Sequence, residues 1–154
     1  MTTSRSPAVA GLFYSADARQ LSQDVNDLLA EAKFNDFKPK ALIVPHAGYL
    51  YSGAVAASAY ASLRAAAATI RRVVLLGPAH RVAVHGLALP GVDVFDTPLG
   101  SVKLDQELAA AIAHFPQVTV SREVHALEHS LEVQLPFLQR VLGDFTLLPL
   151  AIGW

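Results

Sequence analysis

Two histidines that follow similar apolar runs are the residues in this sequence most able to do chemistry. His46 follows the run 41–44 and a proline, and His80 follows the run 73–76 and a second proline. Short apolar runs bounded by Gly or Pro are typical of strands buried on both faces. If the two strands are parallel neighbours, both histidines lie at the sheet edge where open parallel sheets bind ligands. They could share a metal ion there, or each could be an ordinary loop histidine.

The segment around the first histidine combines several useful groups. His46 offers a ligand nitrogen or a general base, and Gly48 allows a tight backbone turn. The phenol groups of Tyr49 and Tyr51 could orient a substrate or a bound oxygen species. The alternative is a tight strand-to-helix turn in which the tyrosine rings cover the core. Residue types alone leave both interpretations open.

A third metal ligand would have to come from elsewhere, and Glu128 and His129 are the candidates. Non-haem iron is typically held by two histidines and a carboxylate, and catalytic zinc by three protein ligands and water. Glu128 could instead favour the start of the next helix through its dipole, or hold a ligating histidine in one tautomer. His129 could simply pack beneath that helix.

Composition narrows the class of protein. The chain has 154 residues, of which 53% are hydrophobic and 16% charged, with a net charge of −1 and no cysteine. Disulfides, thiolate ligands and a cysteine nucleophile are therefore excluded within it. The charge disfavours nucleic acid, no apolar run is long enough to span a membrane, and a cytoplasmic location is expected. The apolar surplus suggests a doubly covered sheet, a homo-oligomer or a piece of a larger fold.

Periodicity predicts alternating strands and helices. Helices are expected over 17–33, over 54–68 with Ser52 as N-cap, after an Asp105 cap, and over 130–142 with a bend at Pro136. Strands are expected over 41–44, 73–76, 118–120 and 145–152, the last at an edge or a bulge because of Pro149. Residues 82–89 fit a strand or an irregular crossover, and 93–99 contain a turn signal. This order predicts one α/β domain over 1–154, with a mostly parallel sheet flanked by helices.

Four motifs in register give the chain a resemblance to a known family. It resembles the N-terminal part of the Memo family, whose prokaryotic members are similar to the B component of a set that includes a radical-SAM protein. The matching segments are 10–14, 45–53, 76–80 and 128–136. Together they extend across nearly the whole chain.

The resemblance implies a fold similar to that of class III extradiol dioxygenases, which hold iron with two histidines and a glutamate. Carried over, His46 and His80 are the metal-binding and catalytic residues, with iron expected and copper or zinc as alternatives. Phe13 and Tyr51 match positions lining the same pocket, and Glu128-His129 matches a family hallmark. The implied activity is a metal-dependent oxidoreductase acting on a small molecule. The alternative is a non-catalytic module that binds a protein or peptide together with the radical-SAM partner.

The chain departs from the family in length. Memo proteins are considerably longer, and their second half adds a Ser-Asp-x-x-His segment and often a cysteine to the pocket. The resemblance therefore implies a single Memo-like domain with a truncated fold, lacking the family's C-terminal half. Catalysis by this chain alone is in doubt on that basis, and an inactive remnant is a third interpretation.

Overall fold

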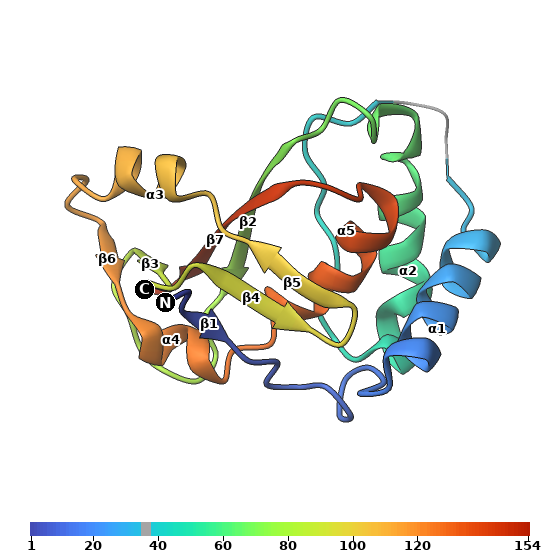
Figure 1. Ribbon diagram of the computed structural model, residues 1–154, viewed down its shortest axis with the longest axis horizontal. Coiled ribbons are helices and arrows are strands. Elements are labelled where there is room, and N and C mark those ends of the chain that lie inside the picture. The colour runs from blue at the N-terminus through green and yellow to red at the C-terminus, as the bar shows by residue number, and fades with distance from the viewer. Residues whose placement is uncertain (35–37) are drawn as a thin grey trace.

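The computed structural model describes residues 1–34 and 38–154, and arranges helices around two small sheets (Figure 1). The strands are β1 (Ser4–Arg5), β2 (Arg72–Pro78), β3 (Leu87–Leu89), β4 (Val94–Thr97), β5 (Gly100–Lys103), β6 (Val118–Val120) and β7 (Thr146–Ile152). The helices are α1 (Ala18–Glu31), α2 (Tyr49–Ala61), α3 (Gln106–Ile112), α4 (Arg122–Ala126) and α5 (Leu135–Val141), with 3-10 turns η1 (Arg64–Ala66) and η2 (Glu132–Gln134).

The α/β class is confirmed, but both sheets are mixed rather than parallel throughout. The larger sheet has the order β2-β7-β3-β6. Strand β2 is parallel to β7, β3 is antiparallel to β7, and β3 is parallel to β6. The smaller sheet has the order β1-β4-β5, with β1 parallel to β4 and β4 antiparallel to β5. The β4–β5 pair is a tight hairpin, a connection that only antiparallel strands can make. It occupies the region where the sequence indicated only a turn.

Local capping explains the two helices that were predicted best. Asp17 accepts a hydrogen bond from the backbone N–H of Gln20 at the start of α1. Asp105 accepts one from the N–H of Leu108 at the start of α3. A side-chain oxygen at this position satisfies one of the backbone donors that a helix N-terminus leaves without partners. The strand expected over 118–120 is also confirmed, as β6.

Helix α2 begins earlier than expected, and Ser52 is not its N-cap. Gly48 occupies the cap position and has no side chain that could accept a hydrogen bond. The first helical N–H, that of Tyr49, instead donates to the carbonyl of Phe13 over 2.8 Å. The backbone carbonyl of Phe13, which is distant in sequence, therefore takes the place of a side-chain cap.

Neither proline acts as expected. The predicted bend in a helix over 130–142 is wrong, because η2 precedes α5 and Pro136 lies in the first turn of α5, where its missing N–H costs nothing. Strand β7 is central rather than at an edge. Strand β3 pairs with β7 only at Ala151 and Ile152. At Pro149 the edge of β7 that faces β3 therefore has no strand partner, and the missing N–H of the proline breaks no hydrogen bond there.

The strand expected over 41–44 is also wrong for this structure. Residues 41–46 carry no strand assignment, and no backbone-to-backbone hydrogen bond joins them to another described segment. Their pattern still governs burial, since Leu42 and Val44 pack on the main core while Ile43 is fully exposed. Residues 82–86 are irregular, and only the end of the ambiguous 82–89 segment forms a strand.

The two faces of the larger sheet are covered unequally. Helices α1, α2 and α5 lie together at the right of Figure 1 and share the main core with Val73 and Leu75 of β2. On the opposite face α3 packs over Leu148 and Leu150. Val74 and Leu76, their register partners on β2, are more than half exposed. Part of the apolar surplus therefore lies at the surface.

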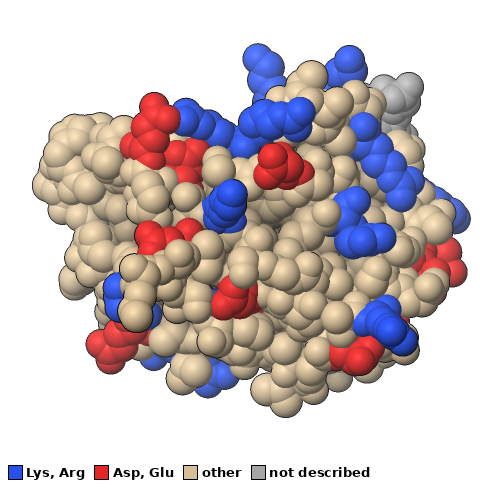
Figure 2. All heavy atoms as spheres, in the orientation of Figure 1, with Lys and Arg blue, Asp and Glu red and all other residues tan. Residues whose placement is uncertain are grey.

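Charged side chains are spread thinly over the surface. Figure 2 shows acidic groups interspersed with basic ones, the basic groups being most frequent along the upper edge, and wide uncharged areas between them. None of the described helices has the length and apolar character needed to cross a bilayer.

Candidate metal centre

Three histidines from distant parts of the chain meet at one end of β2. His46 lies in the turn before α2, His80 lies two residues beyond β2, and His129 lies between α4 and η2. One potential ligand nitrogen of each lies within 4.8 Å of the others. The ring centroids are 5.2 Å apart for His46–His80 and 4.6 Å apart for His80–His129. This is the only such group of three among the described residues.

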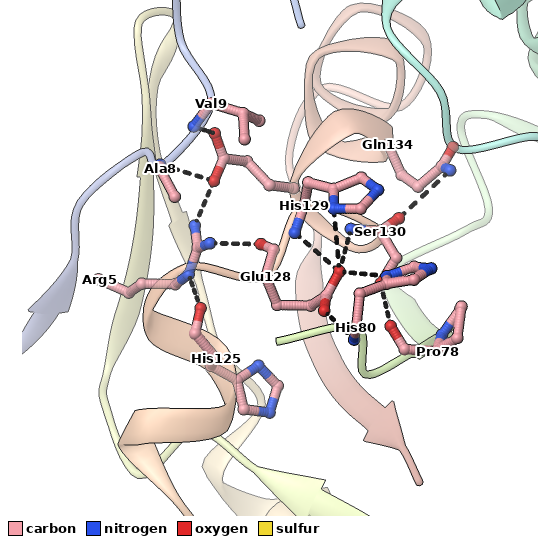
Figure 3. A network of polar contacts seen from close by, with 11 residues as sticks. Arg5, Ala8, Val9, Pro78, His80, His125, Glu128, His129, Ser130 and Gln134 are labelled. Carbon is pink, nitrogen blue, oxygen red and sulfur yellow. Dashed lines mark hydrogen bonds and ion pairs between the residues drawn. The ribbon is translucent and has the colours of Figure 1, made fainter. Parts of the chain in front are cut away.

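The buried carboxylate of Glu128 organises two of these histidines (Figure 3). Its Oε2 accepts the backbone N–H of His80 at 2.5 Å. Its Oε1 accepts the backbone N–H groups of His129 and Ser130 at 2.8 and 2.9 Å, and lies 2.9 Å from Nδ1 of the His80 ring. Because Glu128 is engaged in this way, it fits a role in orienting His80 with Nε2 outward better than a role as a direct ligand.

The charge states suit cation binding. Burial by itself raises the pKa of Glu128, but hydrogen bonds from the backbone of His80 and Ser130 and from the His80 ring outweigh it and lower that pKa to about 2. Burial lowers the pKa values of His46 and His129, and the nearby His80 ring adds to both shifts. Both rings are therefore neutral at pH 7, the form that binds metals.

An unpartnered nitrogen supports the same assignment. Nδ1 of His129 is buried and has no hydrogen-bond partner among the described residues, although Oε1 of Glu128 is 3.3 Å away. Ligation of a ring through one nitrogen lets the other donate to a carboxylate, which is the usual arrangement around metal-bound histidines. Three imidazoles are a donor set that zinc, copper and iron accept.

Replacing Glu128 by Gln is expected to weaken zinc binding by about 10- to 100-fold, the usual effect of losing such a supporting carboxylate. The amide keeps one acceptor but turns an N–H₂ group toward backbone donors. Zinc titration against a chelating dye would measure the change. Glu123→Gln, at an exposed site on α4, is the matched control and should bind zinc as the wild type does.

Two further contacts hold the histidine segments together. The hydroxyl of Ser130 donates to the carbonyl of Pro78 at 2.9 Å, which joins the His129 segment to the end of β2. The side-chain amide of Gln134 donates to the carbonyl of Pro45 at 3.1 Å, which joins η2 to the His46 segment. The side-chain carbonyl of Gln134 accepts the Tyr60 hydroxyl. The three histidines are thus positioned by a connected scaffold rather than by separate loops.

Gly77→Ala is expected to lower the free energy of unfolding by about 1–3 kcal/mol, as overpacked substitutions do. A Cβ at this position would lie 2.7 Å from Oγ of Ser130 and 2.9 Å from Cδ2 of Leu131, closer than real Cβ atoms approach. Urea unfolding followed by circular dichroism would measure the loss. An unchanged midpoint would show that the segment after Glu128 moves away at no cost.

The N-terminus is fastened to the same segment by a buried ion pair. Nη1 of Arg5 lies 2.7 Å from Oε2 of Glu132, and both side chains are almost completely buried. The guanidinium also donates to the carbonyls of His125 and Glu128 at 2.7 and 2.6 Å. Glu132 additionally accepts the Tyr14 hydroxyl at 2.5 Å. Figure 3 shows Arg5 and its contacts with the segment that carries Glu128, with the rings of His129 and His80 nearby.

Comparison with known proteins shows the family of this chain. A family model described as "Memo-like protein" matches residues 5–154. The chain belongs to the Memo family. It is 40% identical over 149 residues to a "MEMO1 family protein" of Aquifex aeolicus, covering 96% of this chain and 54% of that protein. It is 37% identical over 155 residues to "Protein memo-1 homolog" of Caenorhabditis elegans, covering 97% of this chain and 43% of that protein. The chain thus spans about half the length of the curated Memo relatives it matches.

The remaining residues expected in the pocket of this Memo-family chain lie in different places. Phe13 is at the site, with its ring 4.7 Å from the His129 ring. Tyr49 is part of the core, where its hydroxyl donates to the carbonyl of Val133 and its ring packs against Phe137. Tyr51 is 84% exposed on α2. The structure therefore gathers His46, His80, His129, Glu128 and Phe13, but neither tyrosine ring.

Several residues of the scaffold were not singled out as functional by the sequence analysis. They are Arg5, Ser130, Glu132 and Gln134. Glu132 and Gln134 did carry a signal, because they alternate with Leu131, Val133 and Leu135 in a strongly apolar stretch. Polar residues in such a stretch are buried with it and must find partners. Arg5 carried no comparable signal.

Proposed function

We propose that this Memo-family chain holds a divalent transition metal between His46, His80 and His129, as part of a centre for metal-dependent oxidation. The approach of the three ligand atoms to within 4.8 Å carries the proposal. Iron is the metal we favour, from the relationship we propose to class III extradiol dioxygenases. Copper and zinc are the alternatives that an imidazole donor set accepts.

When bound, such a metal supplies Lewis-acid and redox chemistry. The chain's own groups prepare the site for it. Glu128 accepts from Nδ1 of His80 and leaves Nε2 of that ring to face the ion. Phe13 packs against His129 and shields that ring from water, whereas the exposed side of His80 leaves an approach from solvent. A small aromatic or redox-active molecule is the substrate class that we propose for this opening.

The metal content of the purified protein tests the first part of the proposal. We expect about one equivalent of metal in the wild type and only traces in the His46→Ala/His80→Ala double variant. The matched control is His85→Ala/His114→Ala, which removes two exposed histidines outside the cluster and should keep the metal. Equal trace metal in all three proteins would contradict the proposed site.

Oxygen uptake with catechol-type substrates tests the second part. Because the chain spans about half of its relatives' length, we would measure iron-loaded samples of this chain and of the longer Aquifex aeolicus relative together. Uptake that depends on both histidines supports the oxidoreductase. Uptake by neither iron-loaded protein would contradict it and leave a metal-binding protein without this activity.

A second candidate function is binding of a peptide or partner protein, with a radical-SAM protein as the proposed partner. The observation that favours it is a set of exposed apolar side chains near residues of the site in sequence, namely Leu12 beside Phe13, Leu127 beside Glu128, and Leu50 and Tyr51 shortly after His46. Retained partner binding after replacement of His46 and His80 by Ala would favour this module over the metal enzyme.

A further inference from the structure

Among the residues that the structure describes, no strand lies beside the outer edge of β2, and a segment that leads to the same site pairs with no strand. Strand β2 is terminal in the sheet order β2-β7-β3-β6, so only one of its edges is paired. Residues 41–45, here called the 41–45 segment, make no backbone-to-backbone hydrogen bond with the described parts of the chain. An unpaired strand edge is a template for the addition of another strand.

Side-chain alternation in the 41–45 segment already matches that of β2. Leu42 and Val44 pack on the same core cluster as Val73 and Leu75. Between them Ile43 points away from the core and is fully exposed, just as Val74 is more than half exposed on β2. Because strand side chains alternate with a period of two, a segment of the wrong parity would have to turn every side chain over to join the sheet. This segment needs no such rotation.

Direction and position fit a parallel pairing. Figure 1 shows β2 and the stretch that leads into α2 running in the same general direction, and each is followed by one histidine of the cluster. His46 directly follows Pro45, and His80 follows Pro78 by two residues. The two imidazole rings at these ends are 5.2 Å apart. The carboxyl ends of the two segments are therefore already together.

We propose that a metal ion bound between His46 and His80 closes the 41–45 segment onto the free edge of β2 as a parallel strand. This inference rests on the metal site proposed above. A bridging ion fixes the ends of both segments, which removes most of the entropy cost of bringing them into register. By reciprocity, pairing of the strands holds the two imidazoles at the spacing that the ion requires, so strand pairing and metal affinity favour each other.

Amide hydrogen exchange resolved by NMR, with and without one equivalent of Zn²⁺, tests the proposal. A parallel strand donates only every second N–H to a given neighbour. We therefore expect exchange to slow about tenfold or more with zinc at alternate positions only, either Leu42 and Val44 or Ala41 and Ile43. Hydrogen exchange of the β2 amides that point to its unpaired edge should slow in the same samples. General tightening of the region would instead slow all four amides alike.

Variants and a binding measurement separate the possible outcomes. His80→Ala, which removes one bridging ligand, should keep the zinc-free exchange pattern, and His114→Ala should respond as the wild type does. Competition with a chelating dye on the same samples reports zinc occupancy. Bound zinc without alternate protection overturns the strand addition and leaves the metal site standing. Absence of zinc binding overturns both the metal site and the strand addition. Protection that grows with protein concentration assigns the added strand to a second copy and overturns closure within one chain.

Discussion

Replacing His129 by Ala is expected to weaken zinc binding by roughly 100-fold or more, the largest effect that we predict for a single side chain at the site. The loss should exceed the 10- to 100-fold typical of residues that only support ligands. The reason is geometric, because the His129 ring stacks 4.6 Å from that of His80 and offers the third nitrogen within 4.8 Å. Titration against a chelating dye of known affinity gives the ratio.

The control for this variant must separate ligation from packing. Phe13→Leu removes the ring that covers His129 but leaves all three imidazoles in place, so it should change zinc affinity far less. Circular dichroism spectra of all the proteins should agree. If His129→Ala bound zinc as tightly as the wild type, the ion would be held by His46 and His80 alone, and His129 would be a packing residue.

Removing the carboxylate of Glu132 is expected to cost about 3–5 kcal/mol of unfolding free energy, the usual penalty for leaving one partner of a buried ion pair alone. Glu132→Ala would leave the buried guanidinium of Arg5 without its carboxylate partner, since the Arg5 side chain is only 6% exposed. It would also remove the acceptor of the Tyr14 hydroxyl and of the backbone N–H groups of Ala8 and Val9. Urea unfolding at constant slope measures this loss.

A surface pair provides the comparison. Glu107→Ala breaks the ion pair with Arg72, in which the Glu107 side chain is 78% exposed, and exposed pairs contribute at most about 1 kcal/mol. Glu132→Gln, which keeps one acceptor oxygen, should fall between the two. If Glu132→Ala cost no more than Glu107→Ala, the N-terminal fastening would contribute nothing to stability. Where the Ala variant fails to fold, the Gln variant still gives a value.

Sequence patterns predicted what depends on near neighbours. The cap expected at Asp105 involves a backbone N–H only three positions away, and the structure confirms it. The buried face of α1 follows from apolar spacing within the helix, and Leu21 and Val25 on that face are fully buried. The run 73–76 lies within β2, and its Pro-Ala-His continuation places His80 at the strand's end. The two motifs left open whether His46 and His80 meet, the resemblance to the Memo family implied that they share one site, and in the structure their rings are 5.2 Å apart.

Predictions from sequence patterns were wrong where the structure depends on a partner that is distant in sequence. Residues 41–44 have the composition of a buried strand, but a strand also needs a neighbour to accept its N–H groups, and composition does not reveal whether one is present. Pro149 suggested an edge because the sequence does not show that β3 is too short to reach it. Tyr49 and Tyr51 are two residues apart on a helix, so their side chains point to different sides, one into the core and one into solvent.

By itself, then, the sequence determined the α/β class, the helix capped by Asp105 and the position of His80 just beyond a strand, because each depends on short-range periodicity or on a motif. Only the tertiary structure decided that His129 lies beside His46 and His80, that Glu128 accepts the backbone N–H of His80 and contacts its ring, and that Arg5 pairs with Glu132 below this segment. Those relations join residues 48 to 127 positions apart. They arise because buried polar groups must find partners wherever the packed chain supplies them.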